Sequence, residues 1–173
     1  MSHSALVEQL AAARIGETFN QYAHAPALRE RLAAYLARRA EAPILLVGEA
    51  AGYRGARVSG LPFTSERQLT GAGPAEATAT IVHRVLAELG LEEQVLLWNV
   101  VPTHPHRRGE PYSNRPPTRA EVRDARCFAD ELALNRRVVS VGRLAETALG
   151  APYVRHPSHG GAEAFREGLA RFV

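Results

Sequence analysis

The chain has 173 residues, of which 46% are hydrophobic and 23% charged, as is typical of one globular domain and unlike a disordered chain. Its 21 basic residues exceed the 18 acidic ones by only three, so net charge alone gives no argument for a polyanionic partner. The single cysteine, Cys127, excludes an intramolecular disulfide and any multi-cysteine metal site within this chain. We expect one domain over residues 1–173, with helices in residues 1–42 packing on a sheet.

The first 42 residues are predicted to form helices, and no membrane anchor is expected. "SALVEQLAAARI" predicts a helix over residues 4–15, and "PALRERLAAYLARRA" a second over 26–40 with Pro26 in its first turn. The N-terminal residues have no basic cluster, and no apolar run reaches the roughly 18 residues that span a bilayer. We therefore expect a cytoplasmic protein with no membrane partner.

A buried strand and a helix follow, and the pair is then repeated. "PILLVG" at 43–48 predicts a strand buried on both faces, and a helical period runs from 74 to a glycine stop at 90. "QVLLWNVV" at 94–101 predicts the second strand. After a proline-rich loop, Thr118 and Glu121 form a capping box that predicts the start of a helix. On this helix we expect Cys127 to be a buried thiol.

The last third continues the alternation. Strands are predicted at 136–142 and 151–156, and helices at 143–150 and 161–173. Four alternations of strand and helix indicate an α/β fold, a three-layer α/β/α sandwich with a central four-stranded parallel sheet. Ligands of such sheets bind outside the carboxyl ends of the strands. The loops after the four predicted strands should therefore converge on one cleft.

Three common ligand classes fit these loops poorly. The glycines at 48, 52 and 55 match neither a dinucleotide-binding nor a P-loop spacing. Ser158 follows His156 through one proline, so these side chains are not expected to face one another as in a hydrolase, and no G-x-S-x-G motif exists. A metal site made by His104, His106, His156 and His159 competes with a polar surface loop, and we expect no metal.

The loops instead carry three motifs in order: "GEAAGYRG" with "GLPFTSE" downstream, "WNVVPTHPHRRGEPYSNRPPT", and "HPSHGG". Over about residues 43–165 they resemble the uracil-DNA glycosylase superfamily, and most closely its family 4-like group with G-E-x-P-G, P-F, N-V-V, N-R-x-P-T and H-P-S motifs. The resemblance implies a monofunctional enzyme that hydrolyses the N-glycosidic bond of uracil, or of a related deaminated base, in DNA and leaves an abasic site.

The resemblance also implies site residues. A flipped base must be stacked and read, so Phe63 would stack on it and the Asn99 amide would match uracil O4 and N3–H. His156 would donate a hydrogen bond to the departing base, and Glu49 would orient the attacking water or stabilise the cationic sugar. The catalytic candidates are thus Glu49 and His156, and the base-binding candidates are Gly48, Ala50, Tyr53, Phe63 and Asn99. A core phenylalanine, a strand-end cap and a structural histidine remain the alternatives for Phe63, Asn99 and His156.

Contacts to DNA phosphates and the minor groove are expected from residues around these loops. All basic residues of the chain are arginines, which grip phosphates with a rigid fork, although a GC-rich genome explains the same bias. For any one arginine, a solvated surface charge is the alternative. The DNA-binding candidates are Arg54, Arg57, Arg107, Arg108, Ser158, His159 and Gly160.

The chain departs from the family pattern in the first motif and at the expected cluster. Ala50 stands where the best known members place Asp or Asn, and Ala51 replaces the usual proline. The G-E-x-P-G group usually carries four cysteines for an iron–sulfur cluster, but Thr103 and His104 stand about where one of them would be. Cys127 alone cannot hold a cluster, so we expect no cofactor.

These departures leave a second function open, an abasic-site or damaged-DNA binding protein of the same fold with weak or no turnover. A covalent trap through a histidine after the first motif is not expected, because no histidine lies between Gly48 and Glu66. A metabolic enzyme acting on a small nucleoside is a third class, since fold alone does not determine function. In the first two cases we expect a monomer whose partner is DNA containing uracil or abasic sites.

Overall fold

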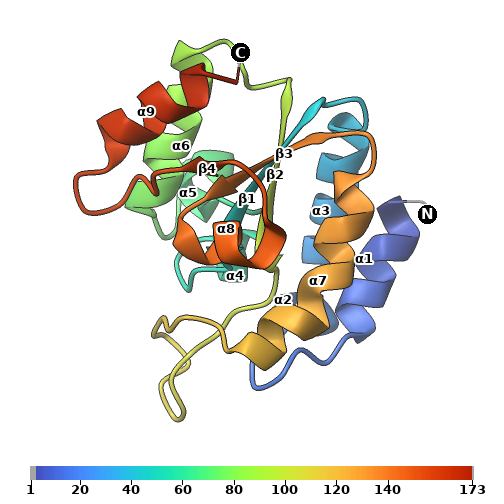
Figure 1. Cartoon of the computed structure of the whole chain (residues 1–173). Coiled ribbons are helices and arrows are strands. Elements are labelled where there is room, and N and C mark those ends of the chain that lie inside the picture. The colour runs from blue at the N-terminus through green and yellow to red at the C-terminus, as the bar shows by residue number, and fades with distance from the viewer. Residues whose placement is uncertain (1–2, 173) are drawn as a thin grey trace.

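The computed structural model describes residues 3–172 as a four-stranded, all-parallel sheet with strand order β2-β1-β3-β4 (Figure 1). The strands are β1 (Ile44–Ala50), β2 (Val95–Val101), β3 (Arg137–Val141) and β4 (Tyr153–Val154). Figure 1 shows α6 and α9 on one side of the sheet and α1, α3 and α7 on the other. The predicted α/β fold is confirmed.

The helices in the described part of the chain follow the predicted order, with three additions. They are α1 (His3–Ala12), α2 (Gln21–His24), α3 (Pro26–Arg38), α4 (Ala56–Ser59), α5 (Glu66–Thr70), α6 (Ala77–Glu88), α7 (Arg119–Ala133), α8 (Arg143–Leu149) and α9 (Ala162–Ala170). Helices α2, α4 and α5 were not predicted, because four or five residues are too few to show a helical period. The predicted last helix reached residue 173, which lies outside the described residues.

The sheet forms the centre of the core. All seven residues of β2 are buried, and Trp98 has no exposed surface, as expected for a parallel strand covered by helices on both faces. The fourth strand is shorter than predicted, with only Tyr153 and Val154 paired to β3. β4 lies at the edge of the sheet and pairs with β3. The strand ends at Val154, and residues 155 and 156 lie in a loop.

The prediction that Cys127 is buried was wrong. The thiol is exposed on α7, whose buried residues are Glu121, Ala125, Phe128, Ala129 and Leu132. These follow a spacing of three to four residues, as one face of a helix requires, and position 127 falls between them. The buried face of α7 is thus the one that packs against β1 and β2.

The N-terminal helices contact one another and reach the sheet and its loops. The amide of Leu97 in β2 donates to the Tyr35 hydroxyl at 2.7 Å. Phe19 and His104 form an antiparallel bridge that joins the N-terminal segment to the loop after β2. Among residues 3–172, no helix is long and apolar enough to cross a membrane.

The predicted capping box at the start of α7 is confirmed and extended. Thr118 accepts from the Glu121 amide at 3.2 Å, and Glu121 accepts from the Thr118 amide at 2.8 Å. Arg115 adds a two-pronged ion pair to the same carboxylate, at 2.8 and 2.7 Å. Hydrogen bonds from Arg115, then from the Thr118 amide, lower the pKa of the buried Glu121 to about 2.

Because this pKa lies below its ordinary value of 4.5, Glu121 should stabilise the fold fully above about pH 4.5 and lose that effect as the pH falls towards 2. We expect Glu121→Gln to lower the free energy of unfolding at pH 7 by about 1.5–3 kcal/mol, as for a lost charged hydrogen bond. Denaturant unfolding between pH 2 and pH 7 measures this, and the two proteins should converge at low pH. The exposed Glu88→Gln is the control, and an equal loss there would contradict the prediction.

Candidate active site

A cavity of about 360 Å³ lies at the carboxyl ends of β1 and β2, where ligands of parallel sheets bind. Its volume lies within the range of small-molecule sites. Six of the predicted site residues line it: Glu49, Ala50, Phe63, Asn99, His156 and His159. Its remaining walls come from Ala51, Gly52, Ala56, Glu76, Thr78, Pro105, Asn114 and Arg115. The loops after β1, β2 and β4 therefore meet there, whereas the loop after β3, which was also predicted to converge on the cleft, contributes none of the described lining residues.

The ring of Phe63 and the amide of Asn99 meet over Gly48. Gly48 pairs with Asn99 across β1 and β2. A Cβ at position 48 would lie 2.8 Å from Cε2 of Phe63, closer still to its Cζ, and 3.1 Å from Oδ1 of Asn99. The backbone of Gly48 is thus approached closely from both sides. Gly48 does not line the cavity itself, but the absence of its side chain lets the other two residues come together.

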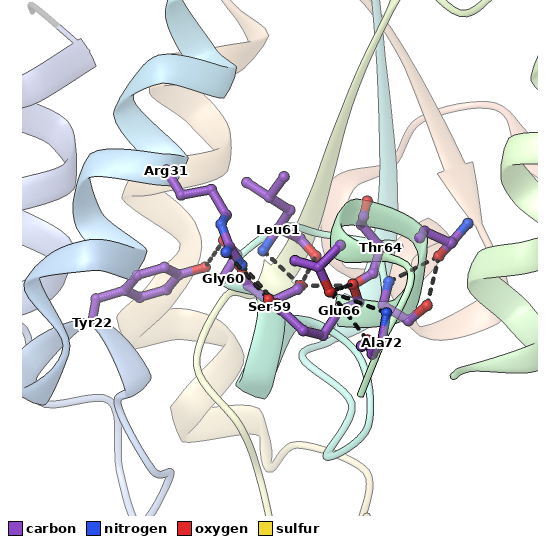
Figure 2. Close-up of polar contacts among 11 residues, drawn as sticks. Tyr22, Arg31, Ser59, Gly60, Leu61, Thr64, Glu66 and Ala72 are labelled. Atoms are coloured by element: carbon purple, nitrogen blue, oxygen red, sulfur yellow. Dashed lines mark hydrogen bonds and ion pairs between the residues drawn. The ribbon is translucent and has the colours of Figure 1, made fainter. Parts of the chain in front are cut away.

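Phe63 is held in a conformation that is unusual for its residue type. Its φ is 51°, a left-handed value that costs about 1–3 kcal/mol and persists only where surrounding contacts impose it. The buried Ser59 hydroxyl supplies such contacts. It accepts a hydrogen bond from the Leu61 amide at 3.0 Å and donates one to the Thr64 carbonyl at 2.6 Å (Figure 2). The loop therefore curls around one hydroxyl and projects Phe63 into the cavity.

The N-terminal helices fix the same loop from behind. Figure 2 shows Tyr22 and Arg31 reaching it: the Tyr22 hydroxyl donates to the Gly60 carbonyl at 2.9 Å, and Arg31 donates to the Ser59 carbonyl at 2.8 Å. Arg31 also pairs with Glu66 at 2.7 Å. These contacts are part-buried or buried and span 28 to 38 residues of sequence, so residues far from the motifs position the Phe63 loop.

His156 presents a neutral imidazole to the cavity. The Ser158 amide donates to its Nδ1 at 3.2 Å, and the Ser158 hydroxyl lies 2.7 Å from the same atom. Since an amide can only donate, Nδ1 carries no proton, and the proton of the neutral ring is on Nε2. Burial, with smaller effects of Arg155 and His159, lowers the pKa of His156. Nε2–H is therefore available as a donor near neutral pH.

The expectation that Ser158 and His156 would not face one another was wrong. The tight turn at Pro157 brings the hydroxyl back onto the ring, and the same hydroxyl lies 3.0 Å from Nδ1 of His159. Ser158 itself is not among the described residues that line the cavity. This serine therefore orients His156 and is not placed to attack a ligand in the cavity.

Glu49 is the acid at the end of β1. It is half-buried, and no hydrogen bond reaches its carboxylate from the described residues. Burial raises the pKa of Glu49 above its ordinary value. A carboxylate of this kind is held away from bulk water and has its oxygens free for a ligand.

Sequence reasoning missed four polar residues of the cavity wall, Glu76, Thr78, Asn114 and Arg115. Asn114 and Arg115 belong to the N-R-x-P-T motif, which was the available signal. Asn114 accepts from the Tyr53 amide at 3.0 Å, and so ties the loop after β2 to the loop after β1. The predicted base-binding residue Tyr53 is outside the cavity wall, and its ring faces the Arg54 guanidinium at 5.2 Å. Glu76 and Thr78 lie at the start of α6 and had no motif to mark them.

The histidines considered as metal ligands lie in two pairs: the rings of His104 and His106 stack at 5.9 Å, and His156 and His159 both contact the Ser158 hydroxyl. His104 is fully buried and bonds through Nδ1 to the Ala51 carbonyl at 2.8 Å, so it holds the loop after β1. Residues 3–172 contain no group of three or more His, Cys, Asp or Glu side chains arranged to hold a metal ion.

None of the four arginines predicted to contact DNA is among the described residues that line the cavity, and they differ in exposure. Arg54 is exposed, whereas Arg57 is sandwiched between the rings of Phe19 and Tyr112 at 4.8 and 5.0 Å. Arg107 is exposed and pairs with Glu110 at 3.5 Å, and Arg108 is also exposed. Both are in the loop of residues 102–117, which projects from the lower edge of the molecule in Figure 1. Gly160, with φ of 74°, shapes the turn after His159.

Comparisons with known proteins agree with the fold. Residues 36–169 match the family model described as the uracil DNA glycosylase superfamily. The crystal structure of wild-type SMUG2 from Pedobacter heparinus is similar to this chain, with a TM-score of 0.72 and 13% sequence identity over 99% of this chain and 97% of that one. No curated protein sequence matches the chain. At this identity, the likeness to the solved structure shows the fold alone.

Proposed function

Because the chain belongs to the uracil DNA glycosylase superfamily, we propose that it excises uracil, or a related deaminated base, from DNA by hydrolysing the N-glycosidic bond. The observation that carries the proposal is the convergence of Phe63, Asn99, His156 and Glu49 on one cavity. These four side chains offer a stacking face, a donor–acceptor pair, a neutral donor and a carboxylate. Each matches one requirement of the reaction.

The flipped base would stack on Phe63 while the Asn99 amide pairs with its O4 and N3–H. As the C1′–N1 bond breaks, its electrons pass to the base, and His156 Nε2–H would donate to the base oxygen that takes up negative charge. Glu49 would orient the water that adds to C1′ or stabilise the positive charge on the sugar. The 173 residues contain no lysine, so no lysine amine of theirs can attack C1′, which supports hydrolysis by water.

The test is single-turnover release of uracil from labelled oligonucleotides, single- and double-stranded, followed by alkaline cleavage of the abasic product. We expect release from at least one of these substrates and none from the matching thymine oligonucleotide. Binding to uracil-containing DNA without any release would contradict the proposal.

A second candidate is a protein that binds abasic or damaged DNA with weak or no turnover. The observation that favours it is the methyl side chain of Ala50 in the cavity wall, where an amide or carboxylate could otherwise hold a water. Tight binding to abasic duplex, with product release much slower than base excision, would support this function.

The proposed role of Glu49 requires its ionised form and therefore has a pH dependence. Because burial raises its pKa above the ordinary value of 4.5, the carboxylate should be protonated, and excision lost, as the pH falls through a value higher than 4.5. We expect Glu49→Gln to excise uracil about 10²-fold more slowly, the lower end of the range for one lost group that stabilises the transition state. Its rate should also no longer fall at acidic pH. Single-turnover rates from pH 4 to pH 8 measure both. If Glu49→Gln lost activity over the same acidic pH range as the wild type, the titrating group would be another residue.

A further inference from the structure

A stack of two aromatic rings and one guanidinium lies beside the cavity. The guanidinium carbon of Arg57 is 4.8 Å from the centre of the Phe19 ring and 5.0 Å from the centre of the Tyr112 ring. The buried Nε of Arg57 has no hydrogen-bond partner among the described residues, so stacking fixes the guanidinium. Phe19 is fixed in turn, because its backbone exchanges hydrogen bonds of 2.8 and 2.9 Å with His104.

The outer ring of this stack is open to solvent. Tyr112 is 72% exposed, although its neighbours in the stack belong to the folded protein. Arg57 covers one face of the ring, and no contact of Tyr112 with another aromatic ring is found in residues 3–172. The opposite face is therefore free. A fixed aromatic ring beside positive charge is the arrangement on which proteins stack the bases of single-stranded nucleic acids.

Both members of this outer pair adjoin the wall of the cavity. Ala56 and Asn114 line the cavity. Arg57 follows Ala56 directly, and Tyr112 stands two residues before Asn114, so the Cα atoms of Tyr112 and Asn114 are at most about 7 Å apart. The free face of the ring thus lies close to the place where the proposed function puts the flipped base.

Helix α4, only four residues long, fixes two aromatic rings at once. Its Ser59 hydroxyl organises the loop that projects Phe63 into the cavity, and its Arg57 stacks on Tyr112. The position of the ring inside the cavity is therefore tied to that of the ring outside it. A strand with one base on Phe63 has a second ring within reach of the next base. This step rests on the proposed function only in that one nucleotide of DNA enters the cavity.

We propose that Tyr112 is a second base-binding site, on which the unpaired base next to the flipped nucleotide stacks. Inside a duplex each base is paired and stacked on its neighbours, so moving one to Tyr112 costs energy, and this cost is least in a single strand. The site therefore favours single-stranded substrate. Stacking tolerates any sequence, because every base has a flat π face, so the identity of the neighbouring base should matter little.

The test is a double-mutant cycle on binding to a single-stranded oligonucleotide. The probe contains one 2′-fluoro-2′-deoxyuridine, whose fluorine disfavours positive charge on the sugar and so prevents excision. Two further probes lack the base of the 5′ or of the 3′ neighbour, and fluorescence anisotropy gives each Kd. We expect Tyr112→Ala to weaken binding of the full probe about 5- to 150-fold. With one of the two base-lacking probes the loss should shrink to at most about twofold, the scatter of independent effects.

Three controls isolate the contact of the ring with a base. Tyr112→Phe keeps the ring and should bind within about twofold of the wild type. Leu134→Ala removes an exposed apolar side chain at the end of α7, outside the described lining of the cavity, and should leave each Kd unchanged. Annealing the probe to its complement should reduce the effect of Tyr112→Ala, because the neighbouring base is then paired. Thermal unfolding should show that Tyr112→Ala is folded.

Each outcome decides the proposal. The site at Tyr112 is overturned if Tyr112→Ala binds the full probe as well as the wild type, or if the wild type has no measurable affinity for the single strand. A loss of affinity that persists with both base-lacking probes, or is equally large in the duplex, would also overturn it. Excision of natural uracil by a protein with either result would leave the proposed function intact. Conversely, a wild type that follows the expected cycle without excising uracil would overturn the proposed function and support the Tyr112 site.

Discussion

Replacing His156 with alanine is expected to lower the single-turnover rate of uracil excision by about 10²–10³-fold, the effect of removing one donor that serves the transition state. The reason lies in the proton on Nε2. The Ser158 amide and hydroxyl occupy Nδ1, so the donor of the neutral ring can point only away from them. Affinity for uracil-containing DNA should change much less than the rate, because the charge on the base develops as the bond breaks.

Three further variants make this measurement specific. Asn99→Ala should also reduce the rate, since it removes the buried amide that we propose to read the base edge. Ser158→Ala should cause a smaller loss, because the backbone amide still holds Nδ1 and only the hydroxyl contact disappears. His24→Ala removes an exposed histidine at the end of α2 and should have no effect. A His156→Ala protein as fast as the wild type would remove His156 from the reaction.

Replacing Gly48 with alanine is expected to lower excision by about 10²-fold, close to the effect of losing a catalytic donor, although Gly48 does not line the cavity. The added methyl group would meet the Phe63 ring and lie 3.1 Å from Asn99 Oδ1. Phe63 cannot retreat easily, because Ser59 and Tyr22 fix its loop. We also expect a loss of unfolding free energy of about 1–3 kcal/mol, as for overpacked cores.

A matched glycine separates the loss of activity from the loss of stability. Gly168 lies within α9, and a Cβ there would lie 3.2 Å from Val154 Cγ1; neither residue lines the cavity. Gly168→Ala should therefore change the unfolding temperature but not the excision rate at a temperature where both proteins are folded. If Gly48→Ala excised uracil at the wild-type rate, the Phe63 ring would not be held against Gly48 during the reaction.

The elements that could be predicted are those with strong local signals. The continuous apolar runs of β1 and β2 indicated buried parallel strands, and Thr118 and Glu121 marked the start of α7. The motifs also placed Glu49, Phe63, Asn99 and His156 at strand ends or in the loops that follow, and these residues line one cavity. Their roles in the reaction remain predictions, as do the contacts of the arginines with DNA.

Other features depend on which side of a helix or loop faces the rest of the protein. Contacts between residues that are distant in sequence decide this. Cys127 is exposed because α7 packs on the sheet through a neighbouring face. Ser158 meets His156 because the turn after β4 folds back on itself. Arg31 and Tyr22 support the Phe63 loop from helices 28 and 38 residues earlier, and no local pattern encodes such contacts.

The sequence by itself determined the order of the four strands and of the longer helices, the edge of the sheet at which the cavity lies, and six of the residues that line it. Hydrophobic periodicity, glycines and capping residues act over a few neighbouring residues, so they can be read from the chain. Only the tertiary structure decided that Gly48 makes room for Phe63, that the Tyr112 ring lies over Arg57, and that His156 carries its proton on Nε2. Each of these depends on the close approach of two segments, and the distance between them is set by the packing of the whole sheet and its helices.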